Sequence, residues 1–283
     1  MKLITKLPDL RRELSRNRKG KRVGFVPTMG ALHAGHLSLA RRAAKDNDLV
    51  VLSIFVNPLQ FGPQEDFSVY PRDLKKDMRL VKGCVQIVFA PQARDFYPFD
   101  FCTFVEVRGL SGEFCGRSRP GHFTGVATVV AKLFNAIQPD TAYFGQKDAQ
   151  QAVVIQKMVK DLDMPVRVQV MPTVREKDGL AMSSRNAYLS LQERRDALVL
   201  YQSLKSAQRM VFSGLRETQK ILGALEDFIA HTSGARIDYM SIVDKKTLQP
   251  LKVIEKEGLL LLAVFIGKTR LIDNAVLKIA RSR

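Results

Sequence analysis

The fold is decided by the stretch Val23-Gly24-Phe25-Val26-Pro27-Thr28-Met29-Gly30-Ala31-Leu32-His33-Ala34-Gly35-His36. Its apolar start predicts a strand, its glycines mark a turn, and a helical pattern follows from about Gly35 to Lys45. A second apolar run, Leu49 to Phe55, predicts the next strand. Strand, helix and strand in this order indicate the first unit of a doubly wound α/β fold.

The same alternation continues to about residue 175. Strand-like runs at 85–89, 142–144 and 166–170 alternate with helical patterns at 74–82, 124–137 and 149–162. We therefore expect residues 1–175 to form a Rossmann-like domain with a parallel sheet, which binds its ligands along the edge where the strands end.

The pattern changes after residue 175. Two long amphipathic helices are predicted, 192–213 and 215–232, followed by strands at 237–243, 259–266 and 269–272. Residues 176–283 are therefore expected to form a smaller α+β domain.

Composition indicates a globular protein outside membranes. Of 283 residues, 46% are hydrophobic and 26% are charged, as in ordinary globular domains. The longest apolar runs, such as 259–266, fall short of the roughly 18 residues of a membrane span. Charges in the first twelve residues are too closely spaced for a signal peptide, so we expect a cytoplasmic location.

Cysteine usage and net charge each leave two interpretations. The three cysteines lack a C-x-x-C spacing, which favours reduced thiols; a Cys115–His122 nucleophile and base pair is the alternative.

The net charge of +17 fits either a nucleic-acid partner or a surface that attracts anionic substrates. Basic clusters at 11–22 and 268–283 are not interleaved with aromatic residues, which favours anionic substrates over specific nucleic-acid binding.

The turn between the first strand and the first helix has the chemistry of an anion site. A helix start offers unpaired N–H groups and a partial positive charge. His33 and His36 are two of only four histidines and can reach toward the same phosphate, while Gly30 and Gly35 allow a triphosphate to approach the backbone. A metal-binding pair is the alternative, but acidic or thiol ligands at suitable spacing are missing from the sequence.

His33-Ala34-Gly35-His36 resembles the H-x-G-H motif of the nucleotidyltransferase superfamily, and the longer string Pro27 to His36 resembles the form found in pantothenate synthetases. Further blocks resemble that family in the correct order over nearly the whole chain. These blocks are 55–61, 70–72, 119–126, 144–151, 183–186 and 271–274.

The resemblance implies ATP-dependent condensation of pantoate with β-alanine through a pantoyl adenylate. It implies ATP contacts from Met29, Gly30, His33, Gly35, His36, Gly145, Lys147, Asp148, Val174, Met182, Ser183, Ser184 and Arg185. Of these, the residues expected to act in catalysis are His33, His36, Lys147 and Arg185. Lysine and arginine suit triphosphate oxygens, and an aspartate suits a ribose hydroxyl.

The resemblance also implies pantoate ligands at Gln60 and Gln151, with Gln60 serving β-alanine as well. Neutral amides suit the hydroxyls and carboxylate of pantoate, and Pro27 and Met29 are candidates for the apolar wall beside its dimethyl group. Taken alone, each glutamine is better explained as a solvated surface residue, and only the surrounding blocks of the resemblance favour a binding role. Transfer of a nucleotidyl group to a phosphorylated acceptor is the rival reaction, which this neutral pair disfavours.

Mechanistic expectations follow from the chemistry. Pantoate is ionised at neutral pH and needs no base to attack the α-phosphate of ATP, so catalysis rests on positioning and charge stabilisation. We expect Mg²⁺ to be held by the ATP phosphates, with no metal site of the protein's own.

The reactive anhydride requires protection from water, and the loop from about 61 to 75 is the candidate cover. A homodimer is implied by the resemblance alone.

Overall fold

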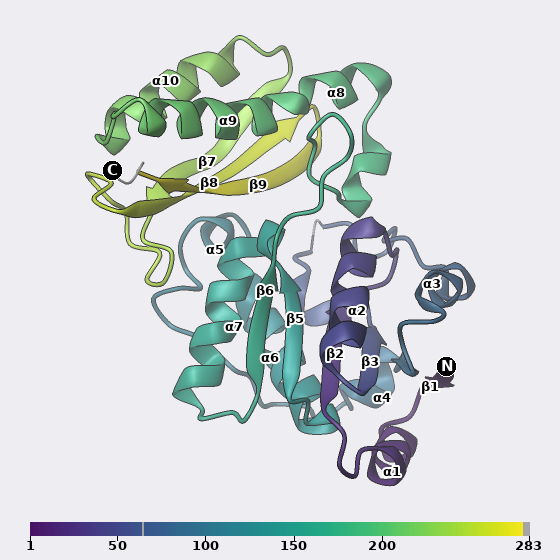
Figure 1. Cartoon of the computed structure of the whole chain (residues 1–283). Helices are drawn as coiled ribbons and strands as arrows, with labels where there is room; N and C mark the ends of the chain where they lie inside the picture. The colour runs from purple at the N-terminus through teal and green to yellow at the C-terminus, as the bar shows by residue number, and fades with distance from the viewer. Residues whose placement is uncertain (64, 280–283) are drawn as a thin grey trace. The chain divides into compact units, whose positions relative to one another are not determined.

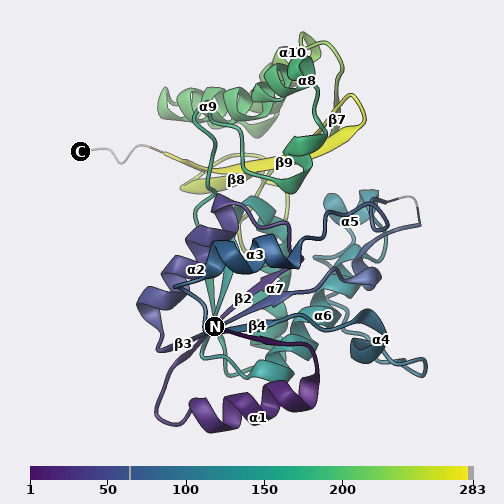
Figure 2. The ribbon, with the colours of Figure 1, turned by 90° about the vertical axis from the view of Figure 1, so that its right-hand side faces the viewer.

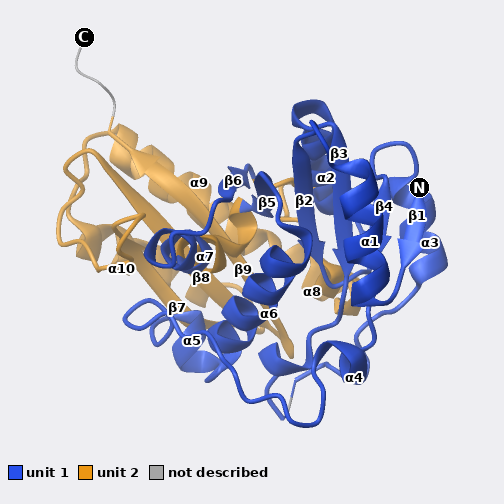
Figure 3. Ribbon diagram, turned by 90° about the horizontal axis from the view of Figure 1, so that it is seen from below, with its two compact units in different colours: residues 1–145, 154–172 blue, residues 146–153, 173–283 orange. Residues whose placement is uncertain are grey.

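The computed structural model describes residues 1–63 and 65–279, which form two compact units (Figure 3). Unit 1 contains residues 1–145 and 154–172; unit 2 contains residues 146–153 and those from 173 onward. The sequence-based boundary at 175 lies close to the break after Pro172, but 146–153 belongs to unit 2. Assignment of ATP and pantoate binding to the first domain stays a prediction.

Unit 1 is built on a six-stranded sheet in which all neighbouring strands are parallel. The strands are β1 (Lys2–Ile4), β2 (Val23–Thr28), β3 (Leu49–Ile54), β4 (Ile87–Phe89), β5 (Thr141–Gly145) and β6 (Arg167–Met171). Their order is β1-β4-β3-β2-β5-β6. From β2 the chain continues to β3 and β4 on one side, and from β5 it continues to β6 on the opposite side. Ligands of such sheets bind where the order reverses, beyond the ends of β2 and β5.

Helices cover both faces of this sheet (Figures 1 and 2). On one face lie α2 (Ala34–Asp46) and α3 (Leu74–Val81); on the other lie α1 (Leu7–Asn17), α6 (His122–Ile137) and α7 (Ala149–Asp161). Successive strand residues point to opposite faces. Val26 accordingly packs with Leu39, while the Phe25 ring meets that of Phe134 at 6.2 Å. The predicted doubly wound fold is confirmed.

Short helices connect the main elements of unit 1. They are η1 (Pro58–Gln60), α4 (Ala93–Phe96) and α5 (Cys115–Ser118). Another short helix, η2 (Gln146–Asp148), lies in unit 2 directly before α7, whose first residues, 149–153, also belong to unit 2.

Two elements of unit 1, β1 and α1, were not predicted from the sequence. The strand has only three residues, too few for a recognisable alternation. The helix carries proline in its first turn, Asp9 close behind it, and Leu10 and Leu14 four residues apart; both leucines are buried. These are ordinary helix signals, although the same segment is also rich in arginine.

Unit 2 contains a three-stranded antiparallel sheet in the order β7-β8-β9. Buried Leu204 and Ile221 from two helices pack with Leu260 of the central strand in one apolar cluster. The elements are η3 (Ser184–Tyr188), α8 (Leu191–Asp196), α9 (Leu198–Phe212), α10 (Thr218–Ala230), β7 (Ala235–Val243), β8 (Glu257–Ile266) and β9 (Thr269–Lys278). The predicted α+β character is confirmed.

Three predicted spans in unit 2 were wrong in detail. The helix expected at 192–213 is interrupted at Ala197. The helix expected from 215 begins at Thr218, because the preceding Glu217 forms a β-bridge with Val253. The last strand continues well beyond residue 272, since the polar residues Asp273 and Asn274 that seemed to end it are buried.

Among the described residues, no helix combines the length and apolar character needed to cross a membrane. The basic stretch 268–283 ends at residues 280–283, which lie outside the described part of the chain.

Candidate active site

The turn that follows β2 is held in a conformation suited to anion binding. Gly30 has φ +86° and Ala31 has φ +50°, so the chain turns sharply before α2 begins. The Thr28 hydroxyl accepts from the Gly30 N–H at 3.2 Å and donates to the carbonyl of Ser53 in β3 at 2.6 Å. The turn is therefore anchored to the neighbouring strand.

His33 and His36 cap the start of α2 reciprocally. Nδ1 of His33 accepts from the Gly35 N–H at 3.1 Å, and Nδ1 of His36 accepts from the His33 N–H at 3.4 Å. The ring centroids are 4.2 Å apart. An Nδ1 that accepts places the proton of the neutral ring on Nε2, so each ring is a donor at Nε2. Two such donors at a helix N-terminus are suited to phosphate oxygens.

Gly35 is required by this arrangement. A Cβ at position 35 would lie 2.8 Å from Cε1 and 2.9 Å from Nδ1 of His33, closer than real contacts allow. Any side chain there would displace the His33 ring.

Asp77, buried on α3, holds the same turn from the other side. Its two carboxylate oxygens accept from the N–H groups of Ala31 at 3.0 Å and Leu32 at 2.8 Å. Burial raises the pKa of Asp77, and the two backbone donors act against that rise. Asp77 was missed in the sequence, although it lies on the apolar face formed by Leu74 and Val81, where a carboxylate needs a partner.

Asp77→Asn is expected to change how stability depends on pH. The folded-state pKa of Asp77 is raised above its ordinary value of 3.8, so the folded protein takes up the proton first as pH falls. The stabilising effect of that proton is complete below the unfolded pKa and is lost as pH rises through the folded pKa. Chemical denaturation of both proteins between about pH 7 and pH 4 should show the wild type gaining stability over the variant as pH falls. A difference that stays constant with pH would contradict this.

Gln60 lies at the end of η1 and is nearly fully buried. Its side-chain N–H donates to the Met29 sulfur at 3.0 Å, and its side-chain oxygen accepts from the Asn57 amide at 3.1 Å. Asn57 also donates to the Gly125 carbonyl at 3.0 Å and accepts from the Tyr97 hydroxyl at 2.9 Å. The structure thus brings two predicted pantoate residues, Met29 and Gln60, together. Asn57 lies in a block noted in the sequence but was given no role there.

In unit 2, β9 holds the segment that carries Lys147. The Asn274 amide donates to the carbonyl oxygens of Gln146 at 2.8 Å and Lys147 at 3.0 Å, and its oxygen accepts from the Gln146 amide at 3.0 Å. The Lys147 Nζ lies 3.7 Å from an Asp148 carboxylate oxygen. Asn274 therefore fixes the backbone from which both predicted ATP ligands project.

Asn274→Asp is expected to lower kcat/KM for ATP about tenfold, since two hydrogen bonds to the η2 carbonyls are lost and carboxylate oxygens then face those carbonyls. Asn274→Ala should cost less, because it removes the donors without adding repulsion. Steady-state kinetics and thermal melting of both variants check this order. Wild-type kcat/KM for ATP in Asn274→Asp would refute the assigned role.

The remaining predicted ATP residues of unit 2 form a second local group. The Met182 N–H donates to the Val174 carbonyl at 3.0 Å, so these two predicted residues are neighbours. Ser183 caps η3 by accepting from the Arg185 N–H at 3.2 Å, and Ser184 begins that helix. The Asn186 amide donates to Glu176 at 2.9 Å and to the Ala181 carbonyl at 3.1 Å, which closes the loop.

The predicted residues thus divide between the two units. Unit 1 carries Pro27, Met29, Gly30, His33, Gly35, His36, Gln60 and Gly145; unit 2 carries Lys147, Asp148, Gln151, Val174, Met182, Ser183, Ser184 and Arg185. The two glutamines expected to bind pantoate therefore belong to different units. Their binding roles stay predictions. Within the described residues, no three His, Cys, Asp or Glu side chains are grouped as ligands for a metal ion.

Residues 2–276 match the family model described as pantoate-beta-alanine ligase. The chain belongs to this family. The pantothenate synthetase of Thermotoga neapolitana is 52% identical over 279 residues, covering 98% of this chain and 100% of that protein. The predictions of family and of ligase activity are confirmed.

Solved ligase structures share the whole fold. The pantothenate synthetase of Thermus thermophilus matches with a TM-score of 0.93 at 46% identity, covering 97% of this chain and 99% of that one. The pantoate-beta-alanine ligase of Francisella tularensis, solved with beta-gamma ATP and beta-alanine, matches with a TM-score of 0.82 at 33% identity over 100% of both chains. The α/β architecture of this ligase is thus that of its family.

Proposed function

We propose that this chain condenses pantoate with β-alanine in an ATP-dependent reaction, by way of a pantoyl adenylate. The observation that carries the proposal is the reciprocal capping of His33 and His36, which sets two Nε2 donors at the start of α2, beyond the end of β2. Family membership and the ligand-bound Francisella tularensis relative support the same reaction.

In the first step, a carboxylate oxygen of pantoate attacks the α-phosphorus of ATP and pyrophosphate leaves. The attacking group is already ionised, so no base is required. We assign the stabilisation of charge on the phosphoryl oxygens to His33, His36, Lys147 and Arg185, and contacts with the ribose to Asp148. Mg²⁺, when bound, would neutralise phosphate charge and be held by the phosphates of ATP.

In the second step, the neutral amine of β-alanine attacks the carbonyl carbon of the anhydride, the bond between that carbon and the bridging oxygen breaks, and AMP leaves. The nitrogen loses one proton to water or to a phosphate oxygen as the amide forms. The AMP retains the oxygen that pantoate supplied. Gln60 and Gln151 would orient pantoate through its hydroxyls, with Pro27 and Met29 beside its methyl groups, and Gln60 would also meet β-alanine. These roles rest on the resemblance and on the contact of Gln60 with Met29.

The proposal is tested with pantoate labelled with ¹⁸O in its carboxylate. Incubation with ATP, Mg²⁺ and β-alanine should give pantothenate and AMP that carries one labelled oxygen, detected by mass spectrometry. Unlabelled AMP would exclude the adenylate, and an absence of both products would exclude pantoate as the substrate.

The segment after η1 is proposed to cover the anhydride. The Phe61 ring contacts those of Phe67 and Tyr70, and Arg72 donates to the Phe67 carbonyl at 2.8 Å, so the segment has its own small cluster. The predicted span 61–75 includes residue 64, outside the described residues, and ends just inside α3. ATP and pantoate together should slow proteolysis of this segment. Equal cleavage with and without them would contradict the proposal.

Mg²⁺ dependence, a homodimer and a cytoplasmic location complete the proposal. They rest on the resemblance and are checked by metal titration of activity, light scattering of the purified protein and cell fractionation.

A further inference from the structure

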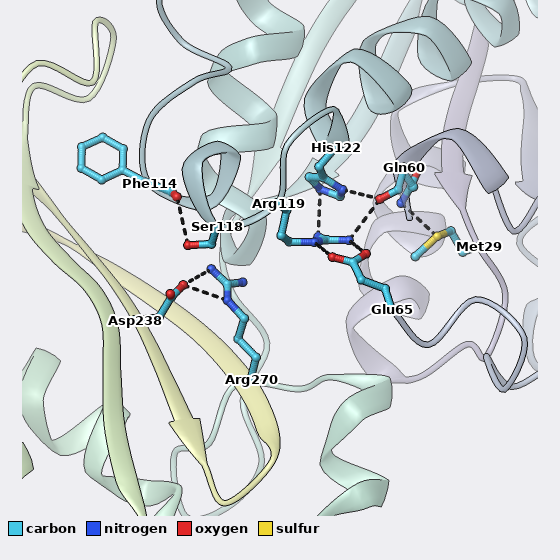
Figure 4. A network of polar contacts seen from close by, with 9 residues as sticks. All are labelled: Met29, Gln60, Glu65, Phe114, Ser118, Arg119, His122, Asp238 and Arg270. Atoms are coloured by element: carbon cyan, nitrogen blue, oxygen red, sulfur yellow. Dashed lines mark hydrogen bonds and ion pairs between the residues drawn. The ribbon is translucent and has the colours of Figure 1, made fainter. Parts of the chain in front are cut away.

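The main chain of Gln60 is held by two side chains that have no role in the proposed reaction steps. The carbonyl oxygen of Gln60 accepts two hydrogen bonds, one from Nδ1 of His122 at 2.8 Å and one from Nη2 of Arg119 at 3.2 Å (Figure 4). Together with the Met29 and Asn57 contacts of its side chain, these bonds fix Gln60 at both ends.

The protonation of His122 follows from its partners. A carbonyl oxygen only accepts, so Nδ1 of His122 carries a proton. Arg119 only donates, and its Nη1 lies 3.1 Å from Nε2 of His122, so Nε2 is the acceptor. The neutral ring with its proton on Nδ1 is the form that satisfies both contacts.

Glu65 orients the guanidinium group of Arg119. The guanidinium meets the carboxylate through two bonds, Nε to Oε1 at 2.5 Å and Nη2 to Oε2 at 2.6 Å, which fix the plane of the guanidinium. The Arg119 and Glu65 side chains are only 13% and 22% exposed. Burial acts to raise the pKa of Glu65, but the hydrogen bonds and charge of Arg119 outweigh it and leave that pKa lowered.

We propose that Arg119 and His122, oriented by Glu65, are positioning residues that set the pantoate-binding amide of Gln60 through its backbone carbonyl. The inference rests on the proposed role of Gln60. Because Glu65 belongs to the segment proposed as a cover, the same ion pair ties that segment to the pantoate-binding element.

The test compares two replacements of His122 that each keep one nitrogen position. The amide nitrogen of His122→Asn lies near the place of Nδ1 and can still donate to Gln60; that of His122→Gln lies near Nε2 and cannot. We expect KM for pantoate to rise about tenfold in His122→Gln and in Arg119→Lys, and to stay within about threefold in His122→Asn. KM for ATP should change less than about twofold in all three.

Arg108→Lys is the matched control, because Arg108 forms an exposed ion pair with Glu106 at 3.2 Å. Equal KM values for pantoate in the two His122 variants, or KM for ATP rising as much as KM for pantoate, would overturn the inference. If His122→Gln does not fold, the inference is tested by comparing KM for pantoate in Arg119→Lys with that in Arg108→Lys. A wild-type protein that makes no pantothenate would instead refute the proposed function.

Discussion

His36→Ala is expected to lower kcat by about 10²- to 10³-fold, the usual cost of removing one preorganised donor from a developing charge. Nδ1 of His36 accepts from the His33 N–H, so the proton of the neutral ring lies on Nε2, which we assign as the donor to a phosphate oxygen. Measurement of pyrophosphate release with pantoate and ATP reports the first step directly.

Two further variants separate the catalytic role of His36 from its capping role. Asparagine has an acceptor near the place of Nδ1 but no donor near Nε2, so His36→Asn should keep the thermal stability and lose kcat. His36→Gln can donate near Nε2 and should retain more activity. His231→Ala, at the exposed end of α10, is the control. Full kcat in His36→Asn would refute the assignment.

Gly125→Ala is expected to impair pantoate binding and stability together. A Cβ at position 125 would lie 2.1 Å from the carbonyl oxygen and 2.4 Å from the carbonyl carbon of Leu59, and 2.7 Å from the Gln60 nitrogen. These are backbone atoms, so η1 must move away from α6 and carry Gln60 with it. We expect KM for pantoate to rise at least about tenfold and the free energy of unfolding to fall by about 1–3 kcal/mol.

Gly223→Ala provides a closely matched control. Gly223 lies inside α10, and a Cβ there meets nothing within 4 Å. Replacement of a helical glycine by alanine in open space adds up to about 1 kcal/mol of stability, so this variant should melt higher with unchanged kinetics. Thermal melts and KM values for pantoate and ATP distinguish the two glycines. A Gly125→Ala protein with wild-type KM for pantoate would show that η1 does not position Gln60.

The main elements of the fold were predictable because their sequence patterns involve only residues that are close together in the chain. The strands at 23–26 and 49–55 are apolar runs, and the helix between them has helical periodicity, so few distant contacts are needed to anticipate them. Prediction failed where a distant partner decides the conformation. The start of α10 depends on pairing of Glu217 with Val253, and β9 extends through Asp273 and Asn274 because both find partners in the folded chain.

Within the candidate site, the groups expected to meet substrate could be recognised in the sequence, whereas the groups that support them required coordinates. His33, His36 and Gln60 stand in recognisable strings. Asp77 binds Leu32 across 45 positions of sequence, His122 binds Gln60 across 62, and Asn274 binds Gln146 across 128. In the sequence, nothing distinguishes these three supporting residues from other polar residues, because their hydrogen bonds to the site form only in the folded chain.

The sequence by itself thus determined the doubly wound architecture, the family, and the anion-binding turn at the start of α2, because periodicity and short motifs are properties of neighbouring residues. Only the tertiary structure decided which polar side chains hold that turn, the Gln60 carbonyl and the Lys147 backbone in place. The physical reason is that a buried polar group must find a hydrogen-bond partner, and in these three cases the partner lies far away along the chain.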